Sequence, residues 1–362
     1  MPAFDTILPA DSVEFCPHPD ANDILLCGTY KLLESENSSG GNEELTSPPS
    51  TSQARRGQCL VLCADSSSPT DTSEIQQLQA IDLPAVLDIK WSHRFGGAGP
   101  LAAIATSEGA ISLHRWQLEE RTLETLQSVQ ATSLETLCLS IDWNNRRTTT
   151  ARPDSIVASL SDGSLTVLSA QDGDGFIITE SWHAHDHEPW IAAWDYWRPN
   201  IIYSGGDDLT LKSWDLRGPK DRPIVTNKRF DAGVTTIQSH PHVESLLAVG
   251  SYDNTVRLFD TRQLLRPLSQ VDVGGGVWRV KWHPSAKRLD DLLVACMHDG
   301  FKIVRFDSPP DGRPSSGDVI QRFDDHTSLA YGVDWSYASD DTGATLIASC
   351  SFYDHSLHVW RG

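Results

Sequence analysis

The sequence predicts an all-β fold, a seven-bladed β-propeller that occupies residues 1–362 as one domain. The prediction depends on a repeated strand–turn–strand unit and on the aromatic–aspartate dipeptide that closes several copies of it. The clearest copy is IIYSGGDDLTLKSWDLR, residues 201–217. Its apolar run, Gly/Asp turn and alternating run indicate a β-hairpin. The closing dipeptide, Trp214-Asp215, is typical of a WD40 blade.

Three further copies set the length of the repeat. They occupy residues 246–262, 292–308 and 345–361. The turn aspartates, one in each of the four copies, are Asp208, Asp253, Asp299 and Asp354. Successive aspartates lie 45, 46 and 55 residues apart. Because a WD40 repeat spans ~40–45 residues, only the last interval requires an extra loop.

Shorter apolar runs complete the seven blades in chain order. Blades 1 to 3 are predicted from runs at 13–16, 24–29 and 58–64, at 86–91, 101–106 and 111–116, and at 137–143, 156–160 and 165–168. Blades 4 to 7 open with runs at 190–197, 234–240, 277–282 and 331–335. The tryptophans at matching positions of the innermost strands are Trp91, Trp143, Trp194, Trp282 and Trp335. Their recurrence indicates packing between neighbouring blades.

Two segments fall outside the repeats. The last blade ends at Trp360 and has no outer strand of its own, so we expect residues 3–8 to pair with it and close the ring. Residues 34–57 are rich in Ser, Glu, Gly and Pro. Such a composition buries too little apolar surface to fold, and we expect a disordered insertion there.

The composition disfavours several classes of function. The formal net charge of −20 argues against direct nucleic-acid binding, which needs a basic surface, and favours basic partners. Seven cysteines with no C-x-x-C pair indicate reduced thiols, so we expect a cytoplasmic protein. The sequence has no signal peptide pattern and no apolar run near the ~20 residues of a membrane span. We expect a monomer that does not contact membranes.

The turns of blades 4 to 7 carry residue types that folding alone does not require. In a propeller these turns and the loops between blades meet on one face, around the central channel. Tyr252, His298 and Tyr353 occupy turn positions where the first copy has Asp207. The asymmetry predicts a functional site at the channel mouth of blades 4 to 7.

The segment SWHAHDHEPW, which leads into blade 4, leaves three interpretations open. His183, His185 and His187 alternate, and with Asp186 and Glu188 they have residue types that bind zinc. A loop histidine can instead orient a neighbouring turn, or act as an acid, a base or a substrate contact. We expect no metal and no cofactor.

Several enzyme motifs are absent from the sequence. It has no G-x-S-x-G nucleophile elbow and no G-x-x-x-x-G-K-[ST] phosphate loop. The glycine-rich run at 96–100 precedes a predicted strand and not a helix, unlike a dinucleotide fingerprint. Serine hydrolases, nucleotide hydrolases and dinucleotide enzymes are therefore disfavoured.

Blades 4 to 7 resemble a known enzyme family. The segments that carry the resemblance include SGGDD (204–208), GSYD (250–253), GGVWRVKWHP (275–284), ACMH (295–298) and CSFYDH (350–355). They are similar to the WD-repeat diphthine methyl ester hydrolases of diphthamide synthesis, also labelled diphthine methyltransferases. The resemblance is close over residues 182–361 and holds only in outline over 1–181. It implies hydrolysis of the methyl ester of diphthine on translation elongation factor 2, before a separate ligase amidates the free acid.

This reaction requires a base, an oxyanion donor and a site for the substrate's trimethylammonium group. We expect His298 as first-choice base and His185 as its rival, oriented by Glu188, Asp253 or Asp299. Arg279 or the backbone of residues 274–276 would meet the oxyanion. The residues expected to bind the substrate are Tyr252, Trp278, Tyr331, Phe352, Tyr353, Asp354 and His355.

Two other functions remain open from the sequence. A non-catalytic WD40 scaffold that binds basic proteins is the commoner use of this fold, and it predicts binding without turnover. A methyltransferase is suggested by the family's second label, but the sequence has no recognisable adenosylmethionine-binding unit.

Overall fold

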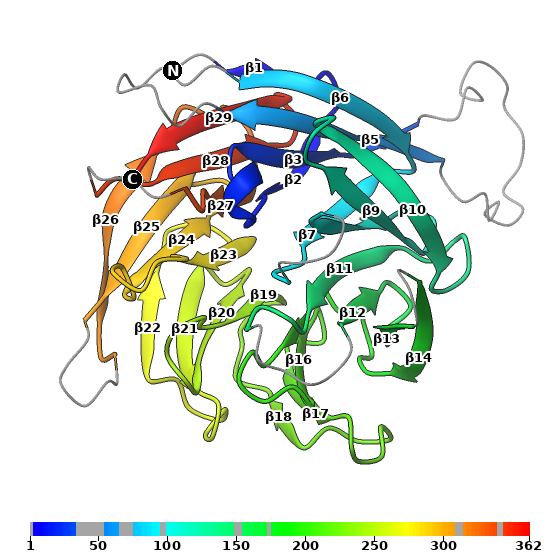
Figure 1. Ribbon diagram of the computed structural model, residues 1–362. Helices are drawn as coiled ribbons and strands as arrows, with labels where there is room; N and C mark the ends of the chain where they lie inside the picture. Colours follow the sequence, from blue (N-terminus) through cyan, green and yellow to red (C-terminus); the bar gives the residue numbers. More distant parts are fainter. Residues whose placement is uncertain are drawn as a thin grey trace, which may run out of the picture.

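The computed structural model describes residues 3–33, 54–64, 75–94, 99–147, 154–171, 175–307, 314–338 and 343–362. Seven antiparallel sheets surround one axis, and each sheet forms a blade (Figure 1). The predicted seven-bladed propeller is therefore confirmed. Among the described residues the single helix is η1 (Pro19–Ala21), and no described helix is long and apolar enough to cross a membrane.

Each of blades 1 to 3 is built from consecutive strands, with the first strand nearest the axis. Blade 1 contains β2 (Ala10–Phe15), β3 (Ile24–Thr29), β5 (Arg55–Ala64) and β6 (Ile75–Leu83), and the short β4 (Lys31–Leu32) pairs with β5. Blade 2 contains β7 (Val86–Trp91), β8 (Leu101–Thr106), β9 (Ala110–Gln117) and β10 (Thr122–Gln130). Blade 3 contains β11 (Cys138–Trp143), β12 (Ser155–Leu160), β13 (Ser164–Ala170) and β14 (Phe176–His183).

Blades 4 to 7 repeat this order. Blade 4 contains β15 (Ile191–Trp194), β16 (Ile201–Gly205), β17 (Leu211–Asp215) and β18 (Val225–Asn227). Blade 5 contains β19 (Val234–Ser239), β20 (Leu246–Ser251), β21 (Thr255–Asp260) and β22 (Ser269–Asp272). Blade 6 contains β23 (Arg279–Trp282), β24 (Asp291–Ala295), β25 (Phe301–Phe306) and β26 (Gly317–Phe323). Blade 7 contains β27 (Ala330–Trp335), β28 (Leu346–Ser351), β29 (Ser356–Arg361) and the N-terminal β1 (Phe4–Asp5).

The N-terminal strand closes the ring as the sequence predicts. Phe4 pairs with Leu357 of β29, so the two ends of the chain share blade 7 (Figure 1). Thr6 continues the contact, because its N–H and its hydroxyl both donate to the carbonyl of His355, at 2.9 and 3.0 Å. This closure leaves no unpaired edge on β29.

Deleting residues 1–9 is expected to lower the free energy of unfolding by roughly 2–4 kcal/mol, because each lost hydrogen bond contributes ~0.5–1.5 kcal/mol. Thermal unfolding followed by circular dichroism measures the loss. The control is Ile7→Gly, which should not destabilise the protein, since Ile7 is 73% exposed and its φ of 65° lies in the region that favours glycine. An unchanged melting temperature after the deletion would contradict ring closure.

The predicted insertion at 34–57 falls mostly outside the described residues. Of its described part, residues 55–57 do not belong to a loop, because they begin β5 and pair with β4 and β6. The insertion is therefore shorter at its C-terminal end than the composition indicated.

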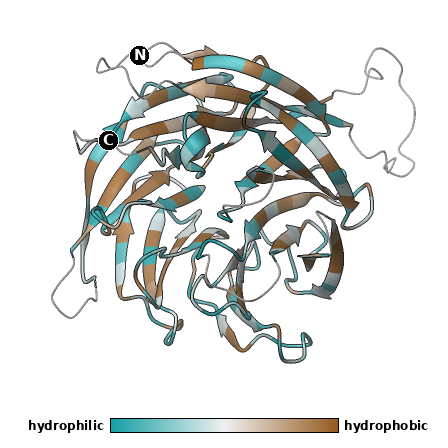
Figure 2. Cartoon of the chain, in the orientation of Figure 1, coloured by the Kyte–Doolittle hydropathy of each residue, from teal (hydrophilic) through white to brown (hydrophobic). Residues whose placement is uncertain are grey.

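Buried apolar residues from neighbouring blades pack together in shared clusters. Figure 2 shows that hydrophobic residues recur along the strands of the blades. The tryptophans predicted to pack between blades are buried, and several also bond to the preceding blade. The indole N–H of Trp143 donates to the carbonyl of Lys90 at 2.9 Å, and that of Trp335 donates to the carbonyl of Lys281, also at 2.9 Å. Trp91 and Trp194 make the corresponding bonds to Glu14 and Asp142. The repeated tryptophan therefore joins blades by packing and by a hydrogen bond.

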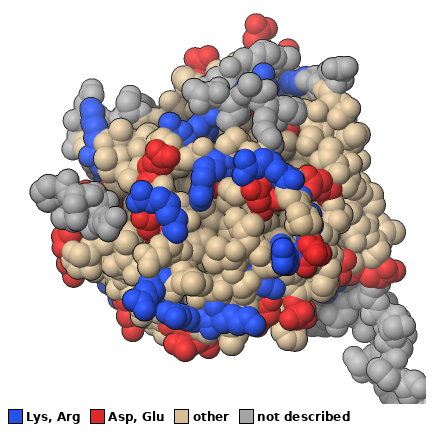
Figure 3. All heavy atoms as spheres, turned by 90° about the horizontal axis from the view of Figure 1, so that it is seen from below, with Lys and Arg blue, Asp and Glu red and all other residues tan. Residues whose placement is uncertain are grey.

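The outer surface mixes both signs of charge. In the side view of Figure 3, Lys and Arg side chains lie next to Asp and Glu side chains around an uncharged centre. Short exposed ion pairs contribute to this pattern, such as Arg217–Asp215 and Arg262–Asp260, both at 2.6 Å. The net acidity of the chain therefore does not produce one uniform acidic surface on this side.

Candidate functional site

An arc of aromatic side chains lies on the face that carries the hairpin turns. We call it the aromatic arc, and its members, from blade 4 through blades 5, 6 and 7 to blade 1, are Trp190, Tyr252, Trp278, Tyr331, Tyr353, Phe352 and Tyr30. Trp278 is at its centre: its ring is 4.8 Å from that of Tyr331 and nearly parallel to it, 5.7 Å from that of Trp190 and 6.0 Å from that of Tyr252. Phe352 extends the arc to Tyr331 at 5.2 Å and to Tyr30 at 6.0 Å.

The five aromatic residues predicted to bind the substrate all belong to this arc. They come together because hairpin turns and the starts of innermost strands share one face of the ring. Trp190 and Tyr30 also belong to it, although the sequence did not single them out for binding. Most of the rings are half-buried, whereas Tyr353 is 71% exposed at the edge of the arc.

Two β-bulges lie at the arc, one at Asp11 and one at the arc member Tyr331. The register between β2 and β3 shifts between Ala10 and Ser12, so Asp11 has no partner residue in the ladder. The register between β27 and β28 shifts in the same way around Tyr331. Gly332 brings the two bulges together, because a Cβ there would lie 2.7 Å from the backbone N of Val13. Bulges commonly re-aim side chains near active sites.

Asp11 is a buried carboxyl without a partner in the described part of the chain. It is 7% exposed, and no hydrogen bond or ion pair of its side chain occurs among the described residues. Burial raises the pKa of Asp11 to about 7, against the opposing effect of Arg279 and with a smaller contribution from Asp88. Sequence reasoning missed this residue because it placed the first strand of blade 1 at residues 13–16, whereas β2 begins at Ala10.

Below the arc, buried charges connect blades across the ring. Arg279 of β23 lies 3.2 Å from Asp88 of β7, and its guanidinium is 5.9 Å from the Trp278 ring centre. Lys281 of the same strand pairs with Glu14 of β2 and, at 3.4 Å, with Asp334 of β27. Lys90 bonds to Asp88 at 2.6 Å and pairs with Glu14 at 2.9 Å. These alternating charges fix the position of Arg279 beneath Trp278.

Comparisons with known proteins identify the family. The family model described as "WD domain, G-beta repeat" matches residues 224–260. The mouse protein named diphthine methyltransferase is 39% identical over 343 residues, which are 93% of this chain and 69% of the mouse protein. A Dictyostelium discoideum homolog is 33% identical over 377 residues, 97% of this chain and 96% of that protein. The chain belongs to the diphthine methyltransferase family.

Other relatives of this diphthine methyltransferase family member agree with that assignment. The human protein of the same name is 38% identical, over 92% of this chain and 74% of its own length. Among solved structures, a chain described under "Crystal Structure of Mitotic Checkpoint Complex" has a TM-score of 0.67 and covers 100% of this chain and 93% of its own. At 16% identity this likeness supports the propeller fold alone.

In this family member, His185 is part of the blade framework, and its ring is bonded on both sides in a way that suits an orienting role better than that of a general base. It is 1% exposed, and both ring nitrogens are bonded. Nδ1–H donates to Asp208 at 2.9 Å, which leaves Nε2 to accept from the Ser204 hydroxyl at 2.7 Å. Trp214 donates to the same Ser204 oxygen at 2.9 Å. Burial lowers the pKa of His185, which keeps it neutral and fixed, out of reach of a substrate.

The zinc interpretation is not supported by the positions of the three histidines. His183 and His187 are exposed, whereas His185 points into the blade. No group of three or more His, Cys, Asp or Glu side chains suited to a metal ion occurs among the residues that the structure describes. The orienting role left open for this segment fits His185.

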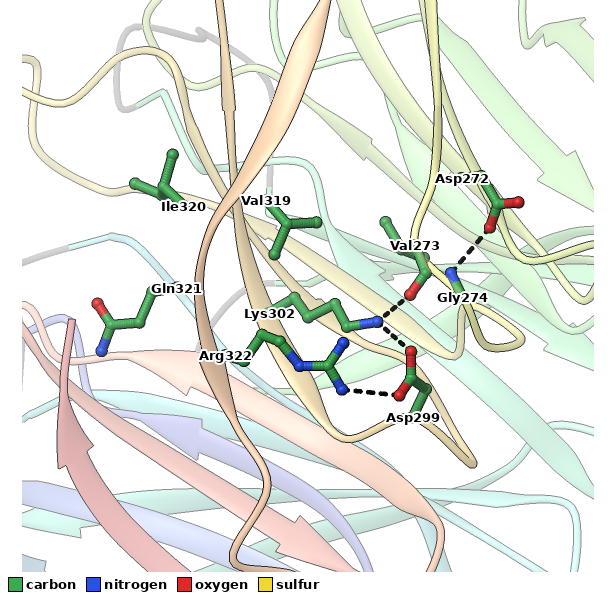
Figure 4. Close-up of a pocket in the computed structure, with 9 residues that line it drawn as sticks. All are labelled: Asp272, Val273, Gly274, Asp299, Lys302, Val319, Ile320, Gln321 and Arg322. Atoms are coloured by element: carbon green, nitrogen blue, oxygen red, sulfur yellow. Dashed lines mark hydrogen bonds and ion pairs between the residues drawn. The ribbon is translucent and has the colours of Figure 1, made fainter.

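Of the three carboxylates expected to orient a base, two are bonded to Arg or Lys side chains and the third is exposed. Asp253 accepts two bonds from Arg257, at 3.0 and 2.8 Å. Asp299 is held by Arg322, at 2.7 Å, and by Lys302 (Figure 4). Glu188 is exposed, and its backbone carbonyl accepts from Asp207 N–H at 3.0 Å. Asp253 and Asp299 therefore stabilise turns of blades 5 and 6, and none of the three bonds to His298 or His185 in the described structure.

His298 faces a surface cleft and not the ring axis. It lines a cavity of about 560 Å³ between blades 6 and 7, together with Tyr353 and Asp324. In the turn of blade 7, Asp354 accepts from Thr327 N–H at 2.9 Å, and the His355 carbonyl is held by the N-terminal segment. Asp354 and His355 thus support the turn that presents Phe352 and Tyr353.

Proposed function

We propose that the protein is a carboxylic ester hydrolase that removes the methyl ester from methylated diphthine on translation elongation factor 2 and releases methanol. The observation that carries the proposal is the aromatic arc above Arg279. The name of the relatives, diphthine methyltransferase, connects the family with diphthine and with methyl chemistry.

The aromatic arc suits a trimethylammonium group. Quaternary ammonium ions bind to the faces of Trp, Tyr and Phe rings by cation–π attraction. Trp278, Tyr252 and Tyr331 offer such faces side by side, and Tyr331 and Trp278 are stacked. The buried carboxyl of Asp11 adds negative charge next to them. The substrate cation would then hold the ester over the ring axis.

Arg279 suits the oxyanion of ester hydrolysis. It is 7% exposed, and the ion pair with Asp88 fixes its guanidinium without occupying all five N–H donors. A fixed cation in a buried site stabilises the negative charge that forms on the carbonyl oxygen in the transition state.

Hydrolysis fits the chain better than methyl transfer. Transfer requires adenosylmethionine, and the sequence contains no recognisable unit for that cofactor. Hydrolysis requires only water, a base and an oxyanion donor, and the face of blades 5 to 7 and blade 1 supplies residues of these types.

The direct test incubates the purified protein with elongation factor 2 that carries methylated diphthine. We expect methanol and a protein mass lower by one CH₂ unit, with no requirement for adenosylmethionine. A scaffold would bind the elongation factor and leave its mass unchanged. Formation of the ester from diphthine and adenosylmethionine would instead support the methyltransferase.

A further inference from the structure

We propose that Asp11 is the general base of this hydrolysis, in the role that the sequence favoured for His298. The inference rests on the proposed function, and it assigns the proton-transfer step to a residue of blade 1. The inference comes from the position of Asp11, which lies near the ring axis, close to the aromatic arc and to Arg279.

Asp11 differs from the other carboxyls near the ring axis. Glu14, Asp88 and Asp334 each pair with Lys or Arg, and Asp142 accepts from the backbone N–H groups of Trp194 and Trp143, at 2.8 and 3.0 Å. No such partner of Asp11 occurs in the described part of the chain. An unpaired buried carboxyl is costly to the fold, so Asp11 stands apart from the paired carboxyls around it as a candidate for a role other than folding.

The surroundings of Asp11 suit a base that acts near neutral pH. The charged and titratable groups that act on it or respond to it are Arg279 of β23, Asp88 of β7, Tyr252 of the blade 5 turn, Tyr331 of β27 and Cys350 of β28. Burial keeps the pKa of both tyrosines above its usual range, so they stay neutral. With its own pKa raised to about 7, Asp11 is substantially ionised at neutral pH and still basic enough to accept a proton.

The reaction balances with water as the only co-reactant. Ionised Asp11 takes one proton from a water molecule while the water oxygen attacks the ester carbonyl carbon. The carbonyl electron pair moves onto the oxygen, where Arg279 faces it. The tetrahedral intermediate then collapses, the bond to the methoxy oxygen breaks, and protonated Asp11 returns the proton to that oxygen. The products are methanol and the free acid, and Asp11 is ionised again.

His298 lacks these surroundings. It is exposed, and the cleft that it lines belongs to the outer side of blades 6 and 7 with Arg322, Asp324 and His326. Its connection to the aromatic arc is through Tyr353, the most exposed ring of the arc. A water molecule at His298 would be open to bulk solvent, and Arg279 does not belong to the lining of that cleft.

The test compares Asp11→Asn, His298→Ala and the matched control Asp186→Asn, an exposed carboxylate on the same face. Methanol release from methylated elongation factor 2 is measured for each, together with thermal unfolding. We expect Asp11→Asn to lower kcat by ~10²–10⁴-fold, the usual effect of removing a base. The two other variants should retain near wild-type rates.

The thermal stability of Asp11→Asn and the pH dependence of the wild-type rate provide two further tests of the inference. Neither depends on loss of activity alone. The raised pKa of Asp11 means that the folded protein loses stability relative to the unfolded chain as pH rises from the ordinary range of an aspartate carboxyl towards about 7. Asp11→Asn should therefore melt at the same or a higher temperature at mildly alkaline pH. In the wild type, kcat/KM should rise as pH increases through about 7, because the ionised form is the base.

Three results would overturn the inference: an active Asp11→Asn, an inactive His298→Ala, or a wild-type rate that does not rise through neutral pH. An Asp11→Asn protein that loses both its fold and its activity would indicate a structural role instead. If the wild type itself released no methanol, the proposed function would fail before any variant was compared.

Discussion

Replacing Trp278 with alanine is expected to lower kcat/KM for methylated elongation factor 2 by roughly 30-fold. A desolvated cation–π contact contributes ~2 kcal/mol or more, and each 1.36 kcal/mol is about tenfold in rate. Trp278 contacts three other rings of the aromatic arc, namely Trp190, Tyr252 and Tyr331. Its loss removes a recognition surface but leaves Asp11 and Arg279 in place.

Two comparisons distinguish a loss of cation binding in Trp278→Ala from a general disruption of the structure. Tyr353→Ala removes an arc member that is 71% exposed, so its effect should be several times smaller. A substrate whose amino group lacks the three methyl groups should react slowly with the wild type, and Trp278→Ala should slow it little further. Equal losses on both substrates would show that Trp278 does not bind the trimethylammonium group.

Lys281→Ala is expected to lower the free energy of unfolding by ~3–5 kcal/mol, the usual cost of removing one partner from a buried ion pair. Lys281 pairs with Glu14 and Asp334, and all three side chains are nearly inaccessible. The substitution leaves the carboxylates of blades 1 and 7 with Lys90 and Arg146 as the cations near them. Urea unfolding at neutral pH measures the loss.

The pH dependence of this loss follows from the same charges. Burial raises the pKa of Asp334 to about 6, and Lys281 opposes that rise. Without Lys281 the carboxyls would protonate at higher pH, so the variant should recover part of the lost stability below pH 6. The control is Arg217→Ala, which breaks an ion pair in which Arg217 is 65% exposed and should cost no more than ~1 kcal/mol. Equal effects of the two variants would mean that the buried charges do not hold the blades together.

Most of the fold could be predicted because each blade depends on sequence patterns between residues that are close together in the chain. A hairpin needs only an apolar run, a turn and an alternating run, as in β16 and β17, and the four copies together with the shorter apolar runs of blades 1 to 3 fix the blade number. The missing outer strand of blade 7 predicted the pairing of β1 with β29. The start of β2 and the end of the insertion were misplaced, because Asp11 and Gly57 do not look like strand residues in isolation.

The candidate site could be predicted only in part. The aromatic residues of the arc were found because turns that share a face must lie near one another. Asp11 could not be found, because its importance comes from a bulge and from Arg279 of blade 6, on a distant part of the sequence. The sequence left the role of His185 open for a related reason: its two bonds, to Asp208 and Ser204, are visible only when the blade is folded.

The most direct test of ester hydrolysis follows the oxygen of water. The reaction is run in water enriched in the heavy oxygen isotope, and the methanol and the diphthine carboxyl are analysed by mass spectrometry. Attack on the carbonyl carbon places the heavy oxygen in the carboxyl group and leaves the methanol unlabelled. Labelled methanol, or methyl loss only when a second methyl acceptor is added, would contradict hydrolysis at the acyl carbon.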